Sequence, residues 1–152
     1  REHSVFKHIC FRELNRCEAL IHDLSFYYEG GHWQTVSPLP ATQNYVERIH
    51  ALAEGWIEGL VAHHYTRYLG DLSGGQALKR IVAKTYGLLD GHGVAFYDFA
   101  QIDDYSAFKT KYRAQLDAMP VDDETAQKIV DEANRVFDLN RELFDSMMKR
   151  LS

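Results

Sequence analysis

The spacing of apolar residues is the feature that most restricts how this chain can fold. Along most of its 152 residues they recur at three- and four-residue steps, the period of an α-helix with one buried face. This spacing predicts helices over residues 13–28, 57–86, 104–118 and 123–150, with residues 87–93 as a loop. Pro38 and Pro40 introduce a further helix, the second along the chain. The sequence lacks the alternation of apolar and polar residues that is typical of strands. We therefore predict an all-α fold.

Four of these helices have a predicted buried stripe. In the first it consists of Leu14, Cys17, Leu20, Ile21, Leu24 and Tyr28, and in the second of Tyr45, Ile49 and Leu52. In the fourth it consists of Tyr105, Phe108, Tyr112 and Leu116, and in the last of Ile129, Ala133, Phe137, Asn140 and Phe144. The last helix should begin at a capping Asp122 or Asp123.

Length and charge narrow the possible functions. A chain of 152 residues fits one compact domain, so we expect a single domain over residues 1–152. A net charge of −5 disfavours a general nucleic-acid binder, and no apolar run approaches the roughly 20 residues that span a bilayer. Cys10 and Cys17 form no metal-binding pair, which favours reduced thiols in a cytosol-like compartment.

Three glycines stand inside the third predicted helix, within six residues of one another. Each interior glycine costs about 0.5–1 kcal/mol relative to alanine, so some interaction must offset the loss. Gly70 and Gly74 share one helix face and leave a strip of bare backbone. Another helix could pack there, which spacing alone slightly favours, or a flat ligand could lie there. Asp71, with Arg67 one turn earlier, could organise water over such a ligand or form an ordinary surface ion pair.

Residues 62–76, AHHYTRYLGDLSGGQ, resemble the distal-helix signature of the heme oxygenases almost residue for residue. The resemblance continues at residues 13–16, 23–28, 95–99, 108–113 and 130–134, so it spans nearly the whole chain. Residues 101–104 and 130–134 are most similar to the ferredoxin-dependent members of phototrophs, which feed bilin synthesis. The resemblance implies a helical bundle whose distal helix is kinked at its glycines.

The resemblance also implies an activity and its partners. Family members are monooxygenases that open heme to biliverdin, carbon monoxide and ferrous iron, with heme as both substrate and cofactor. Electrons would come from ferredoxin or another reductase, in the cytoplasm or the plastid stroma, and neither a nucleic acid nor a membrane is an expected partner. A basic patch for an acidic ferredoxin could consist of Lys79, Arg80, Lys84, Lys109, Lys111 and Arg113.

The resemblance assigns roles to individual residues of the long middle helix. Asp71 and Arg67 would be catalytic, with Asp71 holding a water above the iron. Gly70, Ser73 and Gly74 would lie against the heme face.

Six further residues would bind heme by the same resemblance. Tyr65 would lie at the heme edge, and Lys109 and Arg113 would pair with the propionates, which suit cationic side chains. The last helix would contribute Phe137, Asn140 and Phe144 to the pocket. Without the resemblance, Lys109 and Arg113 fit a solvated helix face better, and the last three fit a core.

One part of the family pattern has no match here. Family members begin with two further helices, the first of which supplies the histidine that binds the heme iron. Residues 1–11 resemble the segment after the second helix, so we expect the domain to be N-terminally incomplete and the axial histidine to lie upstream. We interpret His63 and His64 as ordinary helix residues and assign no metal ligand. Either the two helices belong to the native protein, or the chain is a poor enzyme by itself.

Two alternatives to the enzyme stay open at this stage. The first is a heme carrier or sensor that keeps the pocket without turnover, although a carrier has no need of Asp71. The second is a structural helical domain whose glycines serve helix packing.

Overall fold

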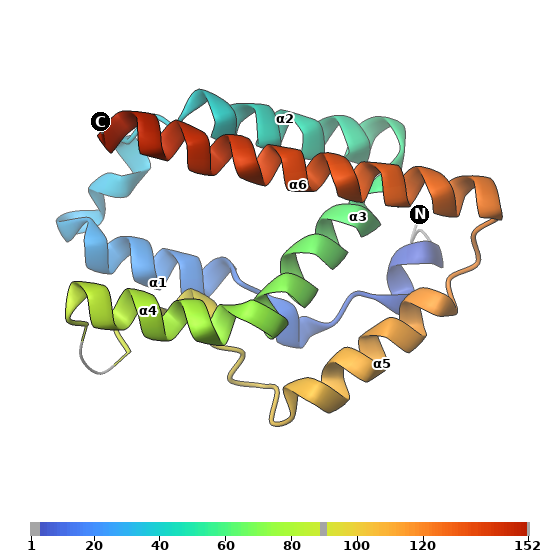
Figure 1. The fold of residues 1–152 in the computed structure, drawn as a ribbon, viewed down its shortest axis with the longest axis horizontal. Coiled ribbons are helices and arrows are strands. Elements are labelled where there is room, and N and C mark those ends of the chain that lie inside the picture. Colours follow the sequence, from blue (N-terminus) through green and yellow to red (C-terminus); the bar gives the residue numbers. More distant parts are fainter. Residues whose placement is uncertain (1–3, 89–90, 152) are drawn as a thin grey trace. The chain divides into compact units, whose positions relative to one another are not determined.

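The computed structural model describes residues 4–88 and 91–151. This part of the chain contains helices and no strand, which confirms the all-α prediction. The α-helices are α1 (Cys17–Tyr27), α2 (Pro40–Gly55), α3 (Leu60–His64), α4 (Gln76–Tyr86), α5 (Tyr105–Asp117) and α6 (Asp123–Leu151) (Figure 1). None of the described helices is both long and apolar enough to cross a membrane.

The chain divides into two compact units. The first unit consists of residues 1–9, 37–67 and 116–152, and the second of residues 10–36 and 68–115. Residues 60–86 are helical throughout, so the helix predicted over residues 57–86 begins three residues later than predicted, after a 3₁₀ turn at residues 57–59. Of the predicted loop, residues 89–90 lie outside the described residues.

In the first unit, α2 lies alongside α6, and both contact α3 and the 3₁₀ turn η4 (Ile57–Gly59) (Figure 1). Leu52, Val61 and Val136 are almost fully buried where these helices meet. A side chain at Gly59 would come within 2.7 Å of Leu52 and of the Trp56 ring, so only glycine lets η4 approach α2 this closely. The carboxylate of Asp122 accepts a 2.8 Å hydrogen bond from the Thr125 amide and caps α6, as predicted.

In the second unit, α1 and α4 both contact the 3₁₀ turn η7 (Ala95–Tyr97). The buried Asp23 of α1 accepts hydrogen bonds from the backbone amides of Ala95 (2.9 Å) and Phe96 (2.8 Å). On α5, Phe108 and Tyr112 are buried, as predicted for that helix. The contacts with α1 and α4, together with the two hydrogen bonds to Asp23, hold η7 in place.

The prediction for the first helix is wrong at its start and in its buried face. The chain forms a separate turn, η2 (Arg12–Leu14), and Asn15 is extended, with its side chain accepting a 3.0 Å hydrogen bond from the Cys17 amide. On α1, Leu20 and Ile21 are more than 40% exposed, whereas Asp23 is buried. The two amides of η7 need a hydrogen-bond acceptor, so α1 turns a carboxylate inward in place of its apolar stripe.

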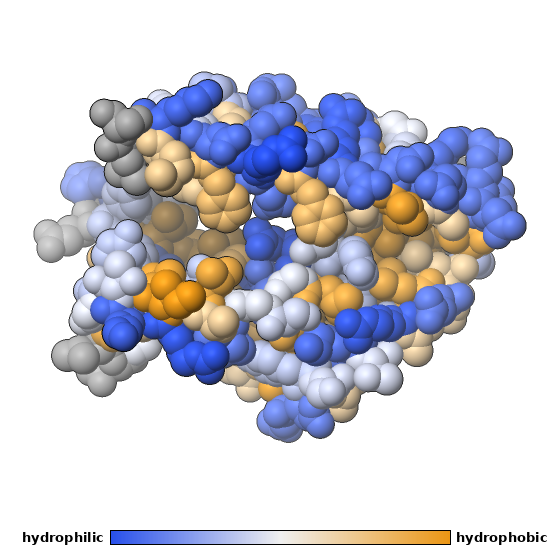
Figure 2. Space-filling model, in the orientation of Figure 1, coloured by the Kyte–Doolittle hydropathy of each residue, from blue (hydrophilic) through white to orange (hydrophobic). Residues whose placement is uncertain are grey.

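The predicted core stripe of α6 is also wrong in part. Phe137 is 59% exposed and Phe144 64% exposed, while Glu132, Val136 and Leu139 form the buried face. Figure 2 shows aromatic rings exposed along α6 and, separately, a group of apolar side chains over α4. The reason is that α2 and α3 pack on the Glu132 side of α6 and leave the phenylalanines uncovered.

Candidate functional site

The glycine-containing helix departs from α geometry where the sequence places the site. It passes from α3 into a π-helical turn, η5 (Tyr65–Leu69), and after Gly70 into a second, η6 (Asp71–Gly75), before α4 begins. The Thr66 hydroxyl donates a 2.7 Å hydrogen bond to the Ala62 carbonyl, a bond that tends to bend helices. Turns of the π type are rare and occur frequently at functional sites.

Gly70 and Gly74 leave an open strip of backbone on this helix. A Cβ atom built on either glycine would meet nothing within 4 Å among the described residues outside the helix backbone. The interpretation that another helix packs on these two glycines, which spacing alone slightly favours, is therefore wrong for the described residues. Gly75 differs from them, because a Cβ there would lie 3.4 Å from the Tyr97 ring. The strip formed by Gly70 and Gly74 can thus accept a flat group against the backbone.

Asp71 lies next to this strip and is only 3% exposed, so the alternative of an ordinary surface ion pair does not describe it. A buried carboxylate is costly unless charge or hydrogen bonds compensate it. The Asp71 charge is the largest favourable charge acting on Arg16, a guanidinium that is 6% exposed in the same unit. Burial nevertheless lowers the pKa of Arg16, and the Phe99 ring lies 3.1 Å below its guanidinium carbon.

The other site residues predicted in the second unit lie on η6 and α5. Ser73 is exposed beside the glycine strip. Lys109 is half-buried and Arg113 is exposed, one turn apart on α5. Of the remaining basic residues, Lys79 forms a 2.5 Å ion pair with Asp98, and Lys111 lies 5.0 Å from the centre of the Phe11 ring.

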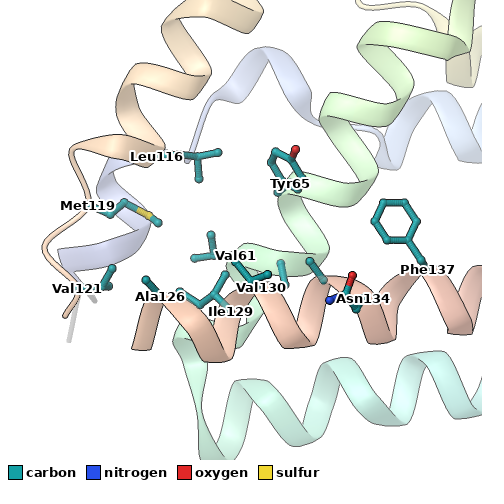
Figure 3. Close-up of a pocket in the computed structure, with 12 residues that line it drawn as sticks. Val61, Tyr65, Leu116, Met119, Val121, Ala126, Ile129, Val130, Asn134 and Phe137 are labelled. Carbon is teal, nitrogen blue, oxygen red and sulfur yellow. The ribbon is translucent and has the colours of Figure 1, made fainter. Parts of the chain in front are cut away.

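In the first unit, Tyr65 and Phe137 both line a cavity of about 420 Å³. Figure 3 shows the cavity between α3, α6 and the chain that precedes α6. Its lining residues are apolar except for Tyr65 and Asn134, a combination common in small-molecule sites. The other lining residues are Val61, Ala62, Leu116, Met119, Val121, Ala126, Ile129, Val130 and Ala133.

Asn140 is held on α6 by two hydrogen bonds. Its amide nitrogen donates to the Val136 carbonyl at 2.8 Å, and its side chain also bonds the Tyr45 hydroxyl. Burial raises the pKa of Tyr45, while the charge of Arg67 and the bond to Asn140 act in the opposite direction. Arg67 itself is exposed.

The predicted site residues are thus shared between the two units. The first unit contains Tyr65, Arg67, Phe137, Asn140 and Phe144, and the second contains Gly70, Asp71, Ser73, Gly74, Lys109 and Arg113. Within residues 4–88 and 91–151, no group of three or more His, Cys, Asp or Glu side chains could hold a metal ion.

Sequence reasoning missed the polar residues that support the predicted ones. Arg16, Tyr45 and Glu132 carry no local signal, because their partners lie far away along the chain. His63 lies in α3, and the sequence did not predict its partner: its imidazole is 7% exposed and bonds Glu132 at 3.1 Å. Burial lowers the pKa of the neighbouring His64 to about 4.

Comparisons with known proteins show which family the chain resembles. Residues 1–146 match the family model for heme oxygenase. The chain is 50% identical over 148 residues to heme oxygenase 1 of Synechocystis sp., covering 97% of this chain and 61% of that protein. It is 48% identical over 147 residues to the heme oxygenase of Pyropia yezoensis, covering 97% and 62%. The chain therefore spans about three fifths of the length of these relatives.

Solved structures give the same result. The crystal structure of heme oxygenase-1 from Synechocystis sp. in complex with heme superimposes with a TM-score of 0.94 at 49% identity, covering 99% of this chain and 67% of that one. The heme oxygenase structure from Leptospira interrogans gives a TM-score of 0.89 at 46% identity, covering 93% and 69%. The fold, the glycine signature and these matches agree, and the chain belongs to the heme oxygenase family.

Proposed function

We propose that this protein is a heme oxygenase that cleaves heme to biliverdin, carbon monoxide and ferrous iron. The observation that carries the proposal is the open strip at Gly70 and Gly74 with the buried Asp71 carboxylate beside it. Bound heme would supply both the iron that activates dioxygen and the ring that is opened.

The residues present fit a flat, largely apolar ligand that carries two carboxylates. A Cβ atom at Gly70 or Gly74 would occupy the space where a ring plane could lie on the backbone. The exposed rings of Phe137 and Phe144 offer apolar contact, and Ser73, Tyr65 and Asn140 offer polar groups for orientation. Lys109 and Arg113 would bind the propionates through charge-assisted hydrogen bonds.

Asp71 would hold and orient the water molecule that delivers protons in the reaction. An ionised carboxylate accepts hydrogen bonds, so a carboxylate oxygen of Asp71 can hold a water molecule and direct one of its protons toward the ligand face. Burial at 3% exposure restricts the carboxylate to few orientations, and Arg16 supplies an opposite charge in the same unit. Arg67, one turn before Asp71, would help to order the same water.

We further propose one heme oxygenase domain over residues 1–152 and a ferredoxin as the electron donor, with the reaction in the cytoplasm or the plastid stroma. The donor and the location are supported by the cyanobacterial and red algal sources of the relatives. The cations that would meet an acidic ferredoxin include Arg80, Lys84 and Arg113, all exposed.

The test supplies the full-length protein with heme, ferredoxin, ferredoxin reductase, reductant and dioxygen, and follows the Soret band. The proposal expects the band to disappear while biliverdin and carbon monoxide appear, and a reaction without reductant serves as the control. A stable band would instead show a carrier or sensor. No band at all would show that the protein does not bind heme.

A further inference from the structure

A buried charged cluster in the first unit lies outside the residues assigned to heme. Glu132 of α6, 5% exposed, accepts hydrogen bonds from Arg48 of α2, at 2.9 Å to Oε1 and 2.5 Å to Oε2. Its Oε1 atom also lies 3.1 Å from Nε2 of His63 on α3. We name Arg48, His63 and Glu132 the three-helix cluster, because each comes from a different helix.

Burial and the surrounding charges together set the protonation state of the His63 imidazole. Burial lowers the pKa of His63 below its ordinary value, although Glu132 opposes this and the charges of Arg48 and Arg135 reinforce it. Burial alone would raise the pKa of Glu132, but the hydrogen bonds from Arg48 and His63 outweigh it and lower the value. At neutral pH Glu132 is therefore an anion and His63 is neutral, with its proton on Nε2.

This arrangement fixes the imidazole in one orientation. Its Nδ1 atom is buried and has no hydrogen-bond partner among the described residues, so the bond from Nε2 to Glu132 is the one that orients the ring. The Tyr45 ring packs against the imidazole edge-on, with centroids 5.5 Å apart and planes at 84°. The orientation of His63 thus limits where the Tyr45 ring can lie.

Tyr45 connects the three-helix cluster to two residues proposed to act at the heme. Its hydroxyl bonds the Asn140 side chain, and the Arg67 charge acts on it. Asn140 also donates a 2.8 Å hydrogen bond to the Val136 carbonyl, so two hydrogen bonds restrict the orientation of its amide.

We propose that His63, anchored on Glu132, is a positioning residue for the heme site. It holds the Tyr45 ring in place, and the Tyr45 hydroxyl then holds the Asn140 amide. The inference rests on the proposed function only in taking Asn140 as a heme-site residue. The two can fail separately, because the geometry of the cluster can be measured without heme.

The experiment compares variants that each remove one part of the contact. His63→Phe keeps a ring beside Tyr45 and loses the donor to Glu132, whereas His63→Gln keeps an N–H donor and loses the ring. Glu132→Gln removes the charge of the anchor with little change of shape. His50→Gln is the matched control, because His50 is an exposed histidine on α2, outside the cluster.

The first readout is the side-chain amide NMR signal of Asn140 in the heme-free, full-length protein, assigned through its loss in Asn140→Ala. We expect this signal to shift in all three cluster variants and to stay in place in His50→Gln. An unchanged signal in His63→Phe would overturn the proposal, because it would reduce His63 to a space-filling ring. If His63→Phe does not fold, an unchanged signal in Glu132→Gln would overturn it equally.

The second readout is heme affinity, measured by Soret titration. We expect about threefold or greater weakening in His63→Phe and no change in His50→Gln, and equal affinities would contradict the link from the cluster to the heme site. If the wild-type protein binds no heme, the proposed function fails, while the Asn140 signal still decides whether His63 positions that amide.

Discussion

The open glycine strip predicts that one substitution will change stability and ligand binding in opposite directions. In Gly70→Ala the new methyl group enters a residue with ordinary right-handed helical angles (φ −61°, ψ −50°) and meets no neighbour within 4 Å. Because an interior helical glycine costs about 0.5–1 kcal/mol relative to alanine, the variant should be more stable by that amount. For a chain of this size the gain corresponds to about 1–4 °C in melting temperature.

The same methyl group should weaken heme binding. It would occupy the space in which the ring plane is proposed to lie, and forcing one additional methyl group into a packed contact costs about 1–3 kcal/mol. The dissociation constant for heme should therefore rise about 5- to 150-fold. Thermal unfolding followed by circular dichroism and Soret titration, both on the same preparation, measure the two effects.

Gly55→Ala is the control for this experiment. Gly55 is exposed at the end of α2, and a Cβ atom there also meets nothing within 4 Å. The Gly55→Ala variant should be at least as stable as the wild type and should bind heme with wild-type affinity. A lower melting temperature for Gly70→Ala would mean that another element packs on the strip. A higher melting temperature with unchanged heme affinity would mean that heme does not touch it, and either result would refute the reasoning.

Three further predictions follow from other residues. Asp71→Ala should keep the Soret band and lose biliverdin formation, and full activity in this variant would exclude Asp71 from the mechanism. Burial lowers the pKa of His64 to about 4, so the unfolded imidazole takes up a proton first as the pH falls below about 6.5. Stability should be greatest above pH 6.5 and fall by up to about 3 kcal/mol toward pH 4, and urea unfolding should show a smaller fall in His64→Gln. Arg113→Ala should weaken heme binding about tenfold, a loss that Soret titration would detect and that added salt should reduce, because the contact is charge-assisted.

The parts of the fold that could be predicted from the sequence depend on near neighbours along the chain. The cap at Asp122 involves a residue three positions away, and α2 begins at Pro40, where the ring of proline suits the first helical turn. The buried stripe of α5 follows from a four-residue step between Phe108 and Tyr112. The signature of the middle helix could be recognised from the sequence as well, because its glycines and Asp71 lie close together along the chain.

The parts that could not be predicted depend on polar groups that meet across long stretches of sequence. Glu132 bonds Arg48 and His63, which lie 84 and 69 positions away along the chain. The spacing of apolar residues cannot predict polar contacts of this kind. Apolar periodicity also shows which face of a helix is apolar without showing what covers it. Phe137 therefore matched a core pattern and proved to be exposed.

The exposed side of α6 has a consequence for the life of the protein in a cell. Val130, Phe137 and Phe144 recur every seven residues and are each more than half exposed. Exposed apolar surface of this kind promotes aggregation, and chaperones and proteases act on chains that expose it. A ligand or segment that covers these three side chains would lengthen the half-life of the protein against degradation. The proposed heme, if it lies on Phe137 and Phe144, should therefore slow proteolysis of the protein, because a ligand that binds the folded state stabilises that state.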